Sequence, residues 1–233
     1  MTNKEEEKQE YVEVPPKKHP DQETEPRPRR ERKGNADMRR RQLVAATLDS
    51  VAKNGLARTT LATVAGEAGL SQGVLVFYFK SKGGLLAAAL HSKYARYQEI
   101  WQAALDAAGP DPLDKLLAVV EADFTPELCD PEALATWFAF WGEHRFTPQY
   151  AEIAEEFDAN RMARLTEVCL DLTRQNGGAE DASRAAQMVL WIDTFTDGLW
   201  QKLHLNPQGF TRETALSLAL EFVHDVIVPR TER

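Results

Sequence analysis

Residues 59–82, TTLATVAGEAGLSQGVLVFYFKSK, contain two short helical patterns separated by a tight Ala-Gly-Leu turn. Thr60 can cap the first helix, Gly69 permits the sharp turn, and Ser71 can cap the second helix. Two helices joined in this way form a helix-turn-helix, which places its second helix in the major groove of DNA. The stretch therefore predicts a binding function rather than catalysis.

The second helix of this unit is the candidate reader of base edges. Its first turn is small and polar, whereas Leu75 and Phe79 are apolar and anchor the opposite side. We expect Tyr78, Lys80 and Lys82 to meet the phosphates. The alternative is a helical hairpin whose lysine pair is merely solvated. The predicted DNA-binding residues are Arg39, Arg40, Thr60, Ser71, Gln72, Gly73, Val74, Tyr78, Lys80 and Lys82.

The run of residues 39–90 resembles the DNA-binding domain of TetR-family transcriptional regulators. The features that occur together are a basic start, a glycine turn at Gly55, the cap at Thr60, the turn at Gly69, and the aromatic-Phe-Lys-x-Lys-x-x-Leu-Leu segment at residues 78–86. The resemblance implies a three-helix DNA-binding domain followed by a larger helical domain for ligand binding and dimerisation.

Charge is unevenly distributed along the chain. The formal net charge is −8, which by itself argues against binding a polyanion. Lys and Arg nevertheless outnumber Asp and Glu by eight in residues 27–82, whereas acidic residues are in excess by four in residues 1–26 and by twelve in residues 83–233. A basic module on an acidic body attracts DNA to one face only.

The length of 233 residues accommodates one DNA-binding module and one larger domain. Residues 1–34 contain five prolines, many charges and no Phe, Trp, Leu or Ile, so they cannot bury enough apolar surface to offset the ordering entropy. We therefore predict a disordered tail at residues 1–34, a helix-turn-helix domain at 35–82, and a helical domain at 83–233. The basic end of the tail is either a flexible arm that contacts DNA or a solvated segment.

Beyond residue 82 the pattern is typical of successive amphipathic helices, separated by Pro and Gly breaks, and strand-like alternation is absent. The predicted helices cover residues 81–107, 112–124, 131–145, 148–175, 180–203 and 211–228. With the three helices of the DNA-binding domain, the sequence predicts an all-α, nine-helix architecture.

The last two helices are the predicted dimer interface, because a protein that reads a twofold DNA site must place two recognition helices about one helical turn apart. Their apolar stripes comprise Met188, Trp191, Ile192, Phe195 and Leu199, and then Leu216, Leu220, Val223 and Ile227. The alternative is that both stripes pack within one subunit. The family resemblance implies a homodimer that binds a palindromic double-stranded DNA operator.

Aromatic and acidic residues of the larger domain indicate what it senses. Trp137 and Trp141 are four residues apart and share a helical face, while Asp193, Asp197 and Trp200 share a face of the next-to-last helix. Indole rings beside a carboxylate can bind an ammonium group through cation–π and charge attraction. These five residues are the predicted ligand site. The alternative is that the aromatic residues form core and the acidic residues are solvated.

The segment TWFAFW at residues 136–141, the helix start at 148–150 and the Asp-Gly-Leu-Trp at 197–200 are similar to the BetI-type branch of the TetR family, which includes choline-responsive repressors of betaine synthesis. The resemblance implies a small-molecule effector that binds among the central helices and weakens DNA binding. Choline-like cations and polyamines both satisfy the acidic and aromatic chemistry. The matching positions are Trp137, Trp141, Asp197 and Trp200.

The metal-ligand patterns His-x-x-x-His and Cys-x-x-Cys are absent from the sequence, and its histidines are isolated. We therefore predict no catalytic residue, no metal ligand and no cofactor. The alternative to a ligand-released repressor is a dimeric protein-interaction or activator module that uses the same fold without an effector. A polar N-terminus and the lack of an apolar run of roughly 20 residues predict a cytoplasmic protein without a membrane partner.

Overall fold

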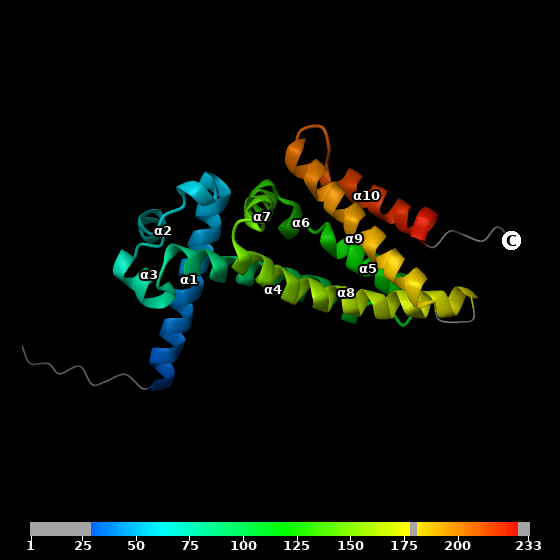
Figure 1. The fold of residues 1–233 in the computed structure, drawn as a ribbon, viewed down its shortest axis with the longest axis horizontal. Helices are drawn as coiled ribbons and strands as arrows, with labels where there is room; N and C mark the ends of the chain where they lie inside the picture. Colours follow the sequence, from blue (N-terminus) through cyan, green and yellow to red (C-terminus); the bar gives the residue numbers. More distant parts are fainter. Residues whose placement is uncertain (1–28, 178–180, 228–233) are drawn as a thin grey trace, which may run out of the picture.

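The computed structural model describes residues 29–177 and 181–227 (Figure 1). This part of the chain forms ten α-helices and a final π-helical segment, η1, and it contains no strand. The elements are α1 (Arg29–Arg58), α2 (Leu61–Glu67), α3 (Gln72–Phe79), α4 (Lys82–Ala107), α5 (Pro112–Asp123), α6 (Pro126–Cys129), α7 (Pro131–Glu143), α8 (Pro148–Gly177), α9 (Ala182–Leu205), α10 (Arg212–Phe222) and η1 (Val223–Ile227). The all-α prediction is confirmed.

Two details of the predicted architecture need correction. The sequence predicted nine helices, and the additional one is α6, a single turn of four residues that is too short to show helical periodicity. The predicted tail was also too long, because α1 begins at Arg29 and residues 29–34 are helical. Arg, Glu and Lys are good helix formers, which favours this extension of α1. The prediction for residues 1–28 lies outside the described residues.

The first three helices pack into a small DNA-binding unit. One face of α1 is buried through Leu43, Thr47 and Val51, which are spaced by four residues and therefore lie on one side of the helix. Helix α1 is kinked at Gly55, whose φ of 73° is a left-handed conformation that glycine adopts without a steric penalty. The glycine turn predicted at this position is therefore present.

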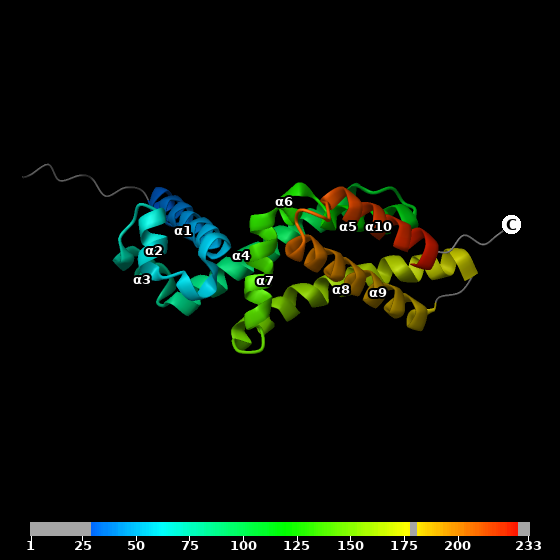
Figure 2. The same ribbon diagram turned by 90° about the horizontal axis from the view of Figure 1, so that it is seen from above.

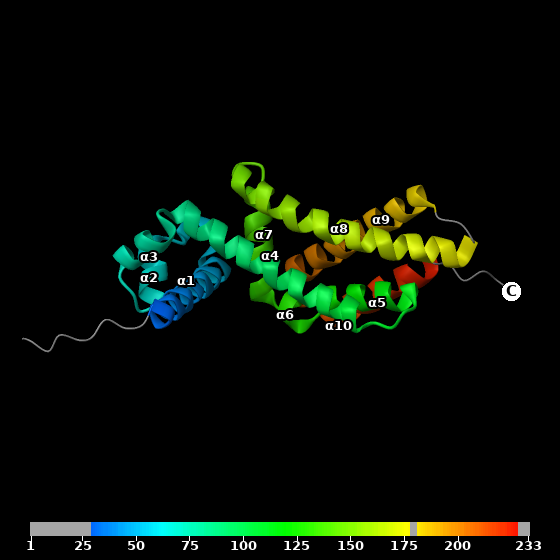
Figure 3. The same ribbon diagram turned by 90° about the horizontal axis from the view of Figure 1, so that it is seen from below.

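Helix α4 joins the DNA-binding unit to the larger domain, and the three views agree that α1–α3 lie at one end of an elongated molecule (Figure 1, Figure 2 and Figure 3). Ser81 caps α4, since its side chain accepts a hydrogen bond of 3.1 Å from the Gly84 backbone amide. The predicted domain boundary at residue 82 thus coincides with the first residue of α4, and the helix continues into the larger domain.

The larger domain is a helical bundle in which α4, α5, α8, α9 and α10 pack side by side, with α7 crossing near the DNA-binding unit. Helices α5 and α7 begin in the same way, with an aspartate cap followed by proline. Helix α7 contacts both α1 and α9, so it joins the two parts of the molecule in addition to α4. Large side chains such as Trp101, Phe124 and Phe140 are almost fully buried in the core.

Candidate functional site

The helix-turn-helix has the geometry that the sequence predicted. Thr60 and Thr63 form a capping box, in which the Thr60 side chain accepts from the Thr63 backbone amide at 3.1 Å and the Thr63 side chain accepts from the Thr60 amide at 2.9 Å. Gly69 has a φ of 64°, which turns the chain sharply between α2 and α3. Leu75 and Phe79 are buried, so they fix one side of α3 against the rest of the unit.

The opposite side of α3 is open to solvent. Ser71, Gln72 and Gly73 are exposed in its first turn, as expected for residues that approach base edges. Ser71 occupies the N-cap position, but its side chain makes no capping hydrogen bond. Residues 69–73 also match the Gly-x-Ser-x-Gly pattern of hydrolase nucleophiles, yet Ser71 follows helix α2 rather than a strand, so the structural context of that motif is missing.

Two apolar residues of the same face were not predicted. Phe77 is 70% exposed and Val76 is 44% exposed, while the predicted Tyr78 and Val74 are half-buried. The Phe77 ring lies edge-on to Tyr78 at 5.2 Å. An exposed aromatic side chain on a recognition helix is a candidate contact to DNA, and the helical spacing from Gly73 could have indicated it.

Basic residues surround this face. Arg39 and Arg40 are exposed on α1, and the Arg40 guanidinium lies 5.0 Å from the ring centre of Phe79, which connects α1 to α3. Lys80 is exposed, and its Nζ donates to the Phe77 carbonyl at 3.0 Å. These residues can meet phosphate oxygens, as predicted for them.

Lys82 has a structural role that the sequence did not reveal. Its Nζ donates to the carbonyl oxygens of Leu56 at 2.8 Å and Ala57 at 3.3 Å, near the end of α1. An ammonium group is favourable at this position because the last carbonyl groups of a helix carry partial negative charge. Contact of Lys82 with a phosphate stays a prediction.

The five residues of the predicted ligand site all line one cavity in the larger domain, with a volume of about 270 Å³. The cavity lies among α4, α7, α8 and α9. The structure adds residues from α4, α8 and the end of α7, which no local pattern connected to the tryptophans. The lining residues are Tyr94, Tyr97, Trp137, Trp141, His144, Ala154, Asp158, Arg161, Met162, Asp193, Asp197 and Trp200.

Aromatic rings form one wall of this cavity. The rings of Trp137, Trp141 and Trp200 lie within 6.0–6.3 Å of one another, and the Trp141 and Trp200 rings are stacked. Tyr94 meets Trp137 edge-on at 4.8 Å, and Tyr97 meets Trp200 at 5.8 Å. The indole rings are therefore part of the hydrophobic core and also part of the cavity wall. The sequence had left these two roles as alternatives.

A buried ion pair supports the cavity from one side. Arg161 Nη2 donates to Asp123 Oδ2 at 2.6 Å, and the two side chains are 3% and 1% exposed. Asp123 also accepts a hydrogen bond of 2.8 Å from the Tyr97 hydroxyl, and its backbone carbonyl accepts one of 2.9 Å from Trp200 Nε1. This network fixes α4, α5, α8 and α9 around the cavity.

Three further carboxylates lie at the cavity without such partners. Within residues 29–177 and 181–227, no side chain forms a hydrogen bond or ion pair with the carboxylates of Asp158, Asp193 and Asp197. Desolvation by the surrounding atoms, and then the charge of Asp193, raise the pKa of Asp158 to about 6, although its side chain is exposed to solvent. Desolvation by the surrounding atoms, and then the charge of Asp193, raise the pKa of Asp197 to about 7, although its side chain is exposed to solvent. Burial also raises the pKa of Asp193.

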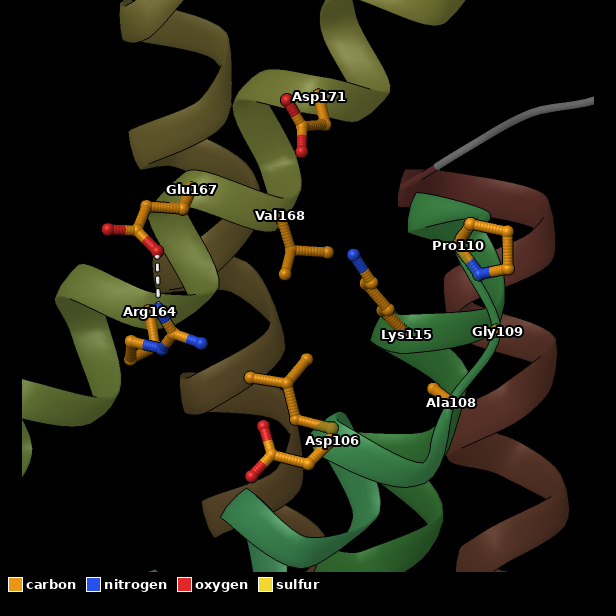
Figure 4. Close-up of a pocket in the computed structure, with 10 residues that line it drawn as sticks. Asp106, Ala108, Gly109, Pro110, Lys115, Arg164, Glu167, Val168 and Asp171 are labelled. Atoms are coloured by element: carbon orange, nitrogen blue, oxygen red, sulfur yellow. Dashed lines mark hydrogen bonds and ion pairs between the residues drawn. The ribbon is translucent and has the colours of Figure 1, made fainter.

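A second cavity, at the far end of the bundle, has a different composition (Figure 4). Its volume is about 510 Å³, and Lys115 extends from α5 into the space toward α8. Arg164 forms an ion pair of 2.9 Å with Glu167 at its edge. Cations and anions are both present here, so this cavity does not select for either sign of charge.

The predicted dimer stripes are largely used within the subunit. Met188, Ile192 and Leu199 of α9 and Val223 and Ile227 of η1 are at most 5% exposed, so the structure corrects their assignment to a subunit interface. They face the core because α9 and α10 must also pack on α5, α8 and each other.

Part of the predicted stripe of α9, Trp191 and Phe195, remains on an apolar face shared with α10 and η1. The Phe195 and Phe222 rings stack at 4.2 Å between the helices and are only half-buried. The α9–α10 apolar face comprises Trp191, Phe195, Leu218, Phe222 and Val226.

In residues 29–177 and 181–227, no group of three or more His, Cys, Asp or Glu side chains is arranged to hold a metal ion. No single helix of this part is long and apolar enough to span a membrane. Helices α3 and α4 reach that length and composition only together, and they are bent by 69° relative to each other.

Two family models match the chain. The model described as bacterial regulatory proteins, tetR family, matches residues 43–89, and the model described as BetI-type transcriptional repressor, C-terminal, matches residues 112–228. The first covers the helix-turn-helix, and the second covers the helices α5–α10, which carry most of the cavity.

Curated relatives are similar over nearly their whole length. The HTH-type transcriptional regulator BetI of Paraburkholderia xenovorans strain LB400 is 34% identical over 200 residues, which is 84% of this chain and 97% of the relative. The protein of the same name from Stenotrophomonas maltophilia strain R551-3 is 30% identical over 192 residues, or 82% and 94% of the two chains.

Solved structures of regulators have the same fold. A transcriptional regulator from Pseudomonas aeruginosa PAO1 superposes with a TM-score of 0.72 at 27% identity, over 80% of this chain and 89% of that chain. A regulator from Saccharomonospora viridis in complex with choline has a TM-score of 0.73 at 20% identity, over 83% of this chain and 100% of that one.

Proposed function

Because the chain belongs to the TetR family of transcriptional regulators, within its BetI-type branch, we propose that it is a homodimeric repressor that a small organic cation releases from a palindromic operator. Its family consists of DNA-binding regulators rather than enzymes, as the sequence predicted. We propose a cationic effector because three indole rings and three unpaired carboxylates line the same cavity.

The proposed DNA contacts divide into two kinds. Gln72, with Ser71 and Gly73, enters the major groove from the first turn of α3, where a Gln side chain can pair with adenine. Arg39, Arg40 and Lys80, with Tyr78, contact phosphates and supply affinity that depends on salt but little on sequence. The remaining members of the predicted set are the cap Thr60, the half-buried Val74 and the helix-end residue Lys82.

A second copy of this chain is the proposed occupant of the α9–α10 apolar face. The face is an apolar surface on two adjacent helices, and two copies related by a twofold axis can cover it mutually. In that dimer each subunit presents one α3, so two recognition helices can reach successive major grooves of a palindromic site. A function on DNA supports the predicted cytoplasmic location.

The effector class follows from the chemistry of the cavity. An ammonium group is attracted by the faces of indole rings and by nearby carboxylates. Choline is bound in the structurally similar regulator from Saccharomonospora viridis. That regulator is 20% identical to this chain, so the likeness shows a shared fold. Choline-like cations and polyamines are both members of the class that we propose.

Two connections can carry the effect of the ligand to the DNA-binding unit. Helix α4 contributes Tyr94 and Tyr97 to the cavity and begins beside α3. Helix α7 contributes Trp137 and Trp141 and contacts α1 directly. A ligand that prefers a dimer with wrongly spaced recognition helices weakens operator binding, and a coupling of about 1–3 kcal/mol changes the affinity about 5–150-fold.

The test is selection of bound sequences from a random DNA pool by the purified full-length protein, at two salt concentrations, with and without candidate amines. We expect a palindromic enriched site that survives moderate salt and is lost with at least one amine. Binding that is only salt-sensitive and independent of sequence would instead support the dimeric protein-interaction module. A palindromic site that no ligand affects would support regulation without an effector.

A further inference from the structure

The cavity carries more negative charge than one small cation can neutralise. Asp158 comes from α8, while Asp193 and Asp197 lie one turn apart on α9. Arg161 is the one Lys or Arg among the lining residues, and its Nη2 is already bonded to the buried Asp123. Burial lowers the pKa of His144, the other basic group at the cavity, which favours its neutral form.

A lysine beside the cavity does not supply the missing charge. Lys93 Nζ lies 4.6 Å from the ring centre of Trp137, but Lys93 is not among the residues that line the cavity. The charges that act on it are those of Asp130 and Glu127, at the start of α7 and in α6. The positive charge of Lys93 is therefore matched outside the cavity.

Two buried donors at the cavity lack a protein partner within the described part of the chain. Trp137 and Arg161 line the cavity and are only 1% and 3% exposed, and both Trp137 Nε1 and Arg161 Nη1 have no hydrogen-bond partner among the described residues. Unpaired donors of this kind are costly in a protein interior, and they need an acceptor such as a water molecule, because a protonated amine has no lone pair with which to accept their hydrogen bonds. The cavity at the far end of the bundle differs, because Lys115 and Arg164 accompany its acidic residues.

We propose that the effector of this cavity carries two or more cationic centres joined by an alkyl chain, as in a diamine or polyamine. This inference rests on the proposed function and narrows its effector class. One ammonium group lies against the indole rings of Trp137, Trp141 and Trp200, and the other lies among the carboxylates of α8 and α9. The alkyl chain packs along the aromatic wall.

Single-charge ligands fit this arrangement less well. A quaternary ammonium such as choline can occupy the aromatic wall, but its nitrogen has no N–H group to donate to the remaining carboxylates. Those carboxylates would then repel each other or take up protons. A diamine supplies charge and N–H donors at both ends, so each added ammonium relieves repulsion that exists in the empty cavity.

Calorimetric titration of the full-length protein without DNA tests this inference directly. DNA is omitted because polyamines bind the nucleic acid itself. The matched probes are butylamine and putrescine, which share a four-carbon chain and differ by one ammonium group, together with choline. We expect putrescine to bind at least about tenfold more tightly than butylamine or choline, which corresponds to about 1.4 kcal/mol.

A pair of variants assigns the preference to the cavity. Asp197→Asn should reduce the ratio of putrescine to butylamine affinity several-fold, whereas Asp106→Asn, an exposed acid of the second cavity, should leave that ratio unchanged. Circular dichroism confirms that both variants are folded. A ratio that falls equally in both variants would assign the preference to general surface charge and overturn the inference.

Two other outcomes separate this inference from the proposed function. If choline or butylamine binds as tightly as putrescine, the requirement for a second charge is wrong while a cationic effector stands. If none of the amines binds and the protein still selects a palindromic DNA site, the cationic effector is wrong and the inference fails with it.

Discussion

At the scale of single residues, Arg161 and Asp123 show how the protein retains charge in its interior. Both side chains are almost fully buried, and Tyr97 adds a further hydrogen bond to the same carboxylate. Removing two charges from water is costly, and the pair is retained because its members satisfy each other. The guanidinium also attracts the cavity carboxylates and opposes the rise of their pKa values, but their burial outweighs this attraction.

Loss of one partner of this pair should be severe. Arg161→Met leaves Asp123 buried without its counter-charge, and we expect the free energy of unfolding to fall by about 3–5 kcal/mol in urea titrations. The matched control is Arg164→Met, which removes an exposed ion pair with Glu167 and should cost less than about 1 kcal/mol. Equal losses in the two variants would contradict the role given to the buried pair.

Asp197 should make stability and ligand binding respond to pH in opposite ways. Its folded pKa of about 7 lies above the value of about 3.9 for an unfolded chain. The folded state therefore binds more protons between these values, and stability falls as the pH rises through about 7. Asp197→Asn removes this effect, so its melting temperature should exceed that of the unchanged protein by more at pH 8 than at pH 5.

The affinity for an amine should change in the other direction. Asp158, Asp193 and Asp197 have raised pKa values and bind a cation only when ionised, while a primary amine stays protonated below about pH 10. Putrescine should bind more tightly at pH 8 than at pH 6, with release of protons that calorimetry detects in buffers of different ionisation enthalpy. Binding that is independent of pH would exclude these carboxylates as partners.

The two kinds of DNA contact should separate by substitution. Gln72→Ala should change the preferred base at particular positions of the site, with a loss of about 1–3 kcal/mol on the preferred sequence. Lys80→Ala should weaken binding to all sequences and flatten the dependence of affinity on salt. Fluorescence anisotropy with preferred and scrambled sites measures both effects, and the same profile for the two variants would contradict this division. Lys82 is less suitable, because its ammonium group also holds the end of α1.

At the scale of helices, the sequence predicted those elements whose ends carry a chemical signal. Thr60, Ser81 and Asp130 precede helices at cap positions, and prolines follow the caps at α5 and α7. The local spacing of Trp137 and Trp141 likewise predicted a shared face. Spacing could not show that Tyr94 and Asp158, from other helices, complete the same cavity, because that depends on how the helices pack. For the same reason it could not distinguish the core stripe of α9 from its exposed face.

Helix α7 links the cavity to the DNA-binding unit, and hydrogen exchange can follow that link. Binding of an amine to Trp137 and Trp141 should slow the exchange of backbone amides in α7 and change exchange in α1, which it contacts. Protection limited to α8 and α9 would show that α7 does not transmit the signal. In Asp197→Asn, where binding is weakened, the same amine concentration should have a smaller effect in every helix.

At the scale of the whole molecule, charge and apolar surface are segregated. The basic residues of α1, together with Lys80 just after α3, belong to the end of the molecule formed by α1–α3, and the acidic body with the α9–α10 apolar face forms the rest (Figure 1). This division favours one orientation on DNA, with the body held away from the phosphates. A twofold pair of such molecules doubles the number of basic ends that one DNA site can engage. The dimer therefore gains more of the salt-dependent affinity than a single subunit.

Substitution on the α9–α10 apolar face should separate dimerisation from folding. Leu218 is 38% exposed and lies four residues before Phe222, so Leu218→Arg places a charge in the proposed interface without entering the core of the subunit. A twofold axis places the substituted residue of both subunits in the interface. The variant should therefore sediment as a monomer at concentrations where the unchanged protein is a dimer.

The matched control is Phe146→Arg, at a residue that is 74% exposed in the connection between α7 and α8, outside this face. The control should stay dimeric and keep its operator affinity. The Leu218→Arg monomer should lose high-affinity binding to the full palindrome while it still binds a half-site weakly, because α3 is intact. A dimer that persists in Leu218→Arg, with unchanged operator affinity, would show that another surface joins the two subunits.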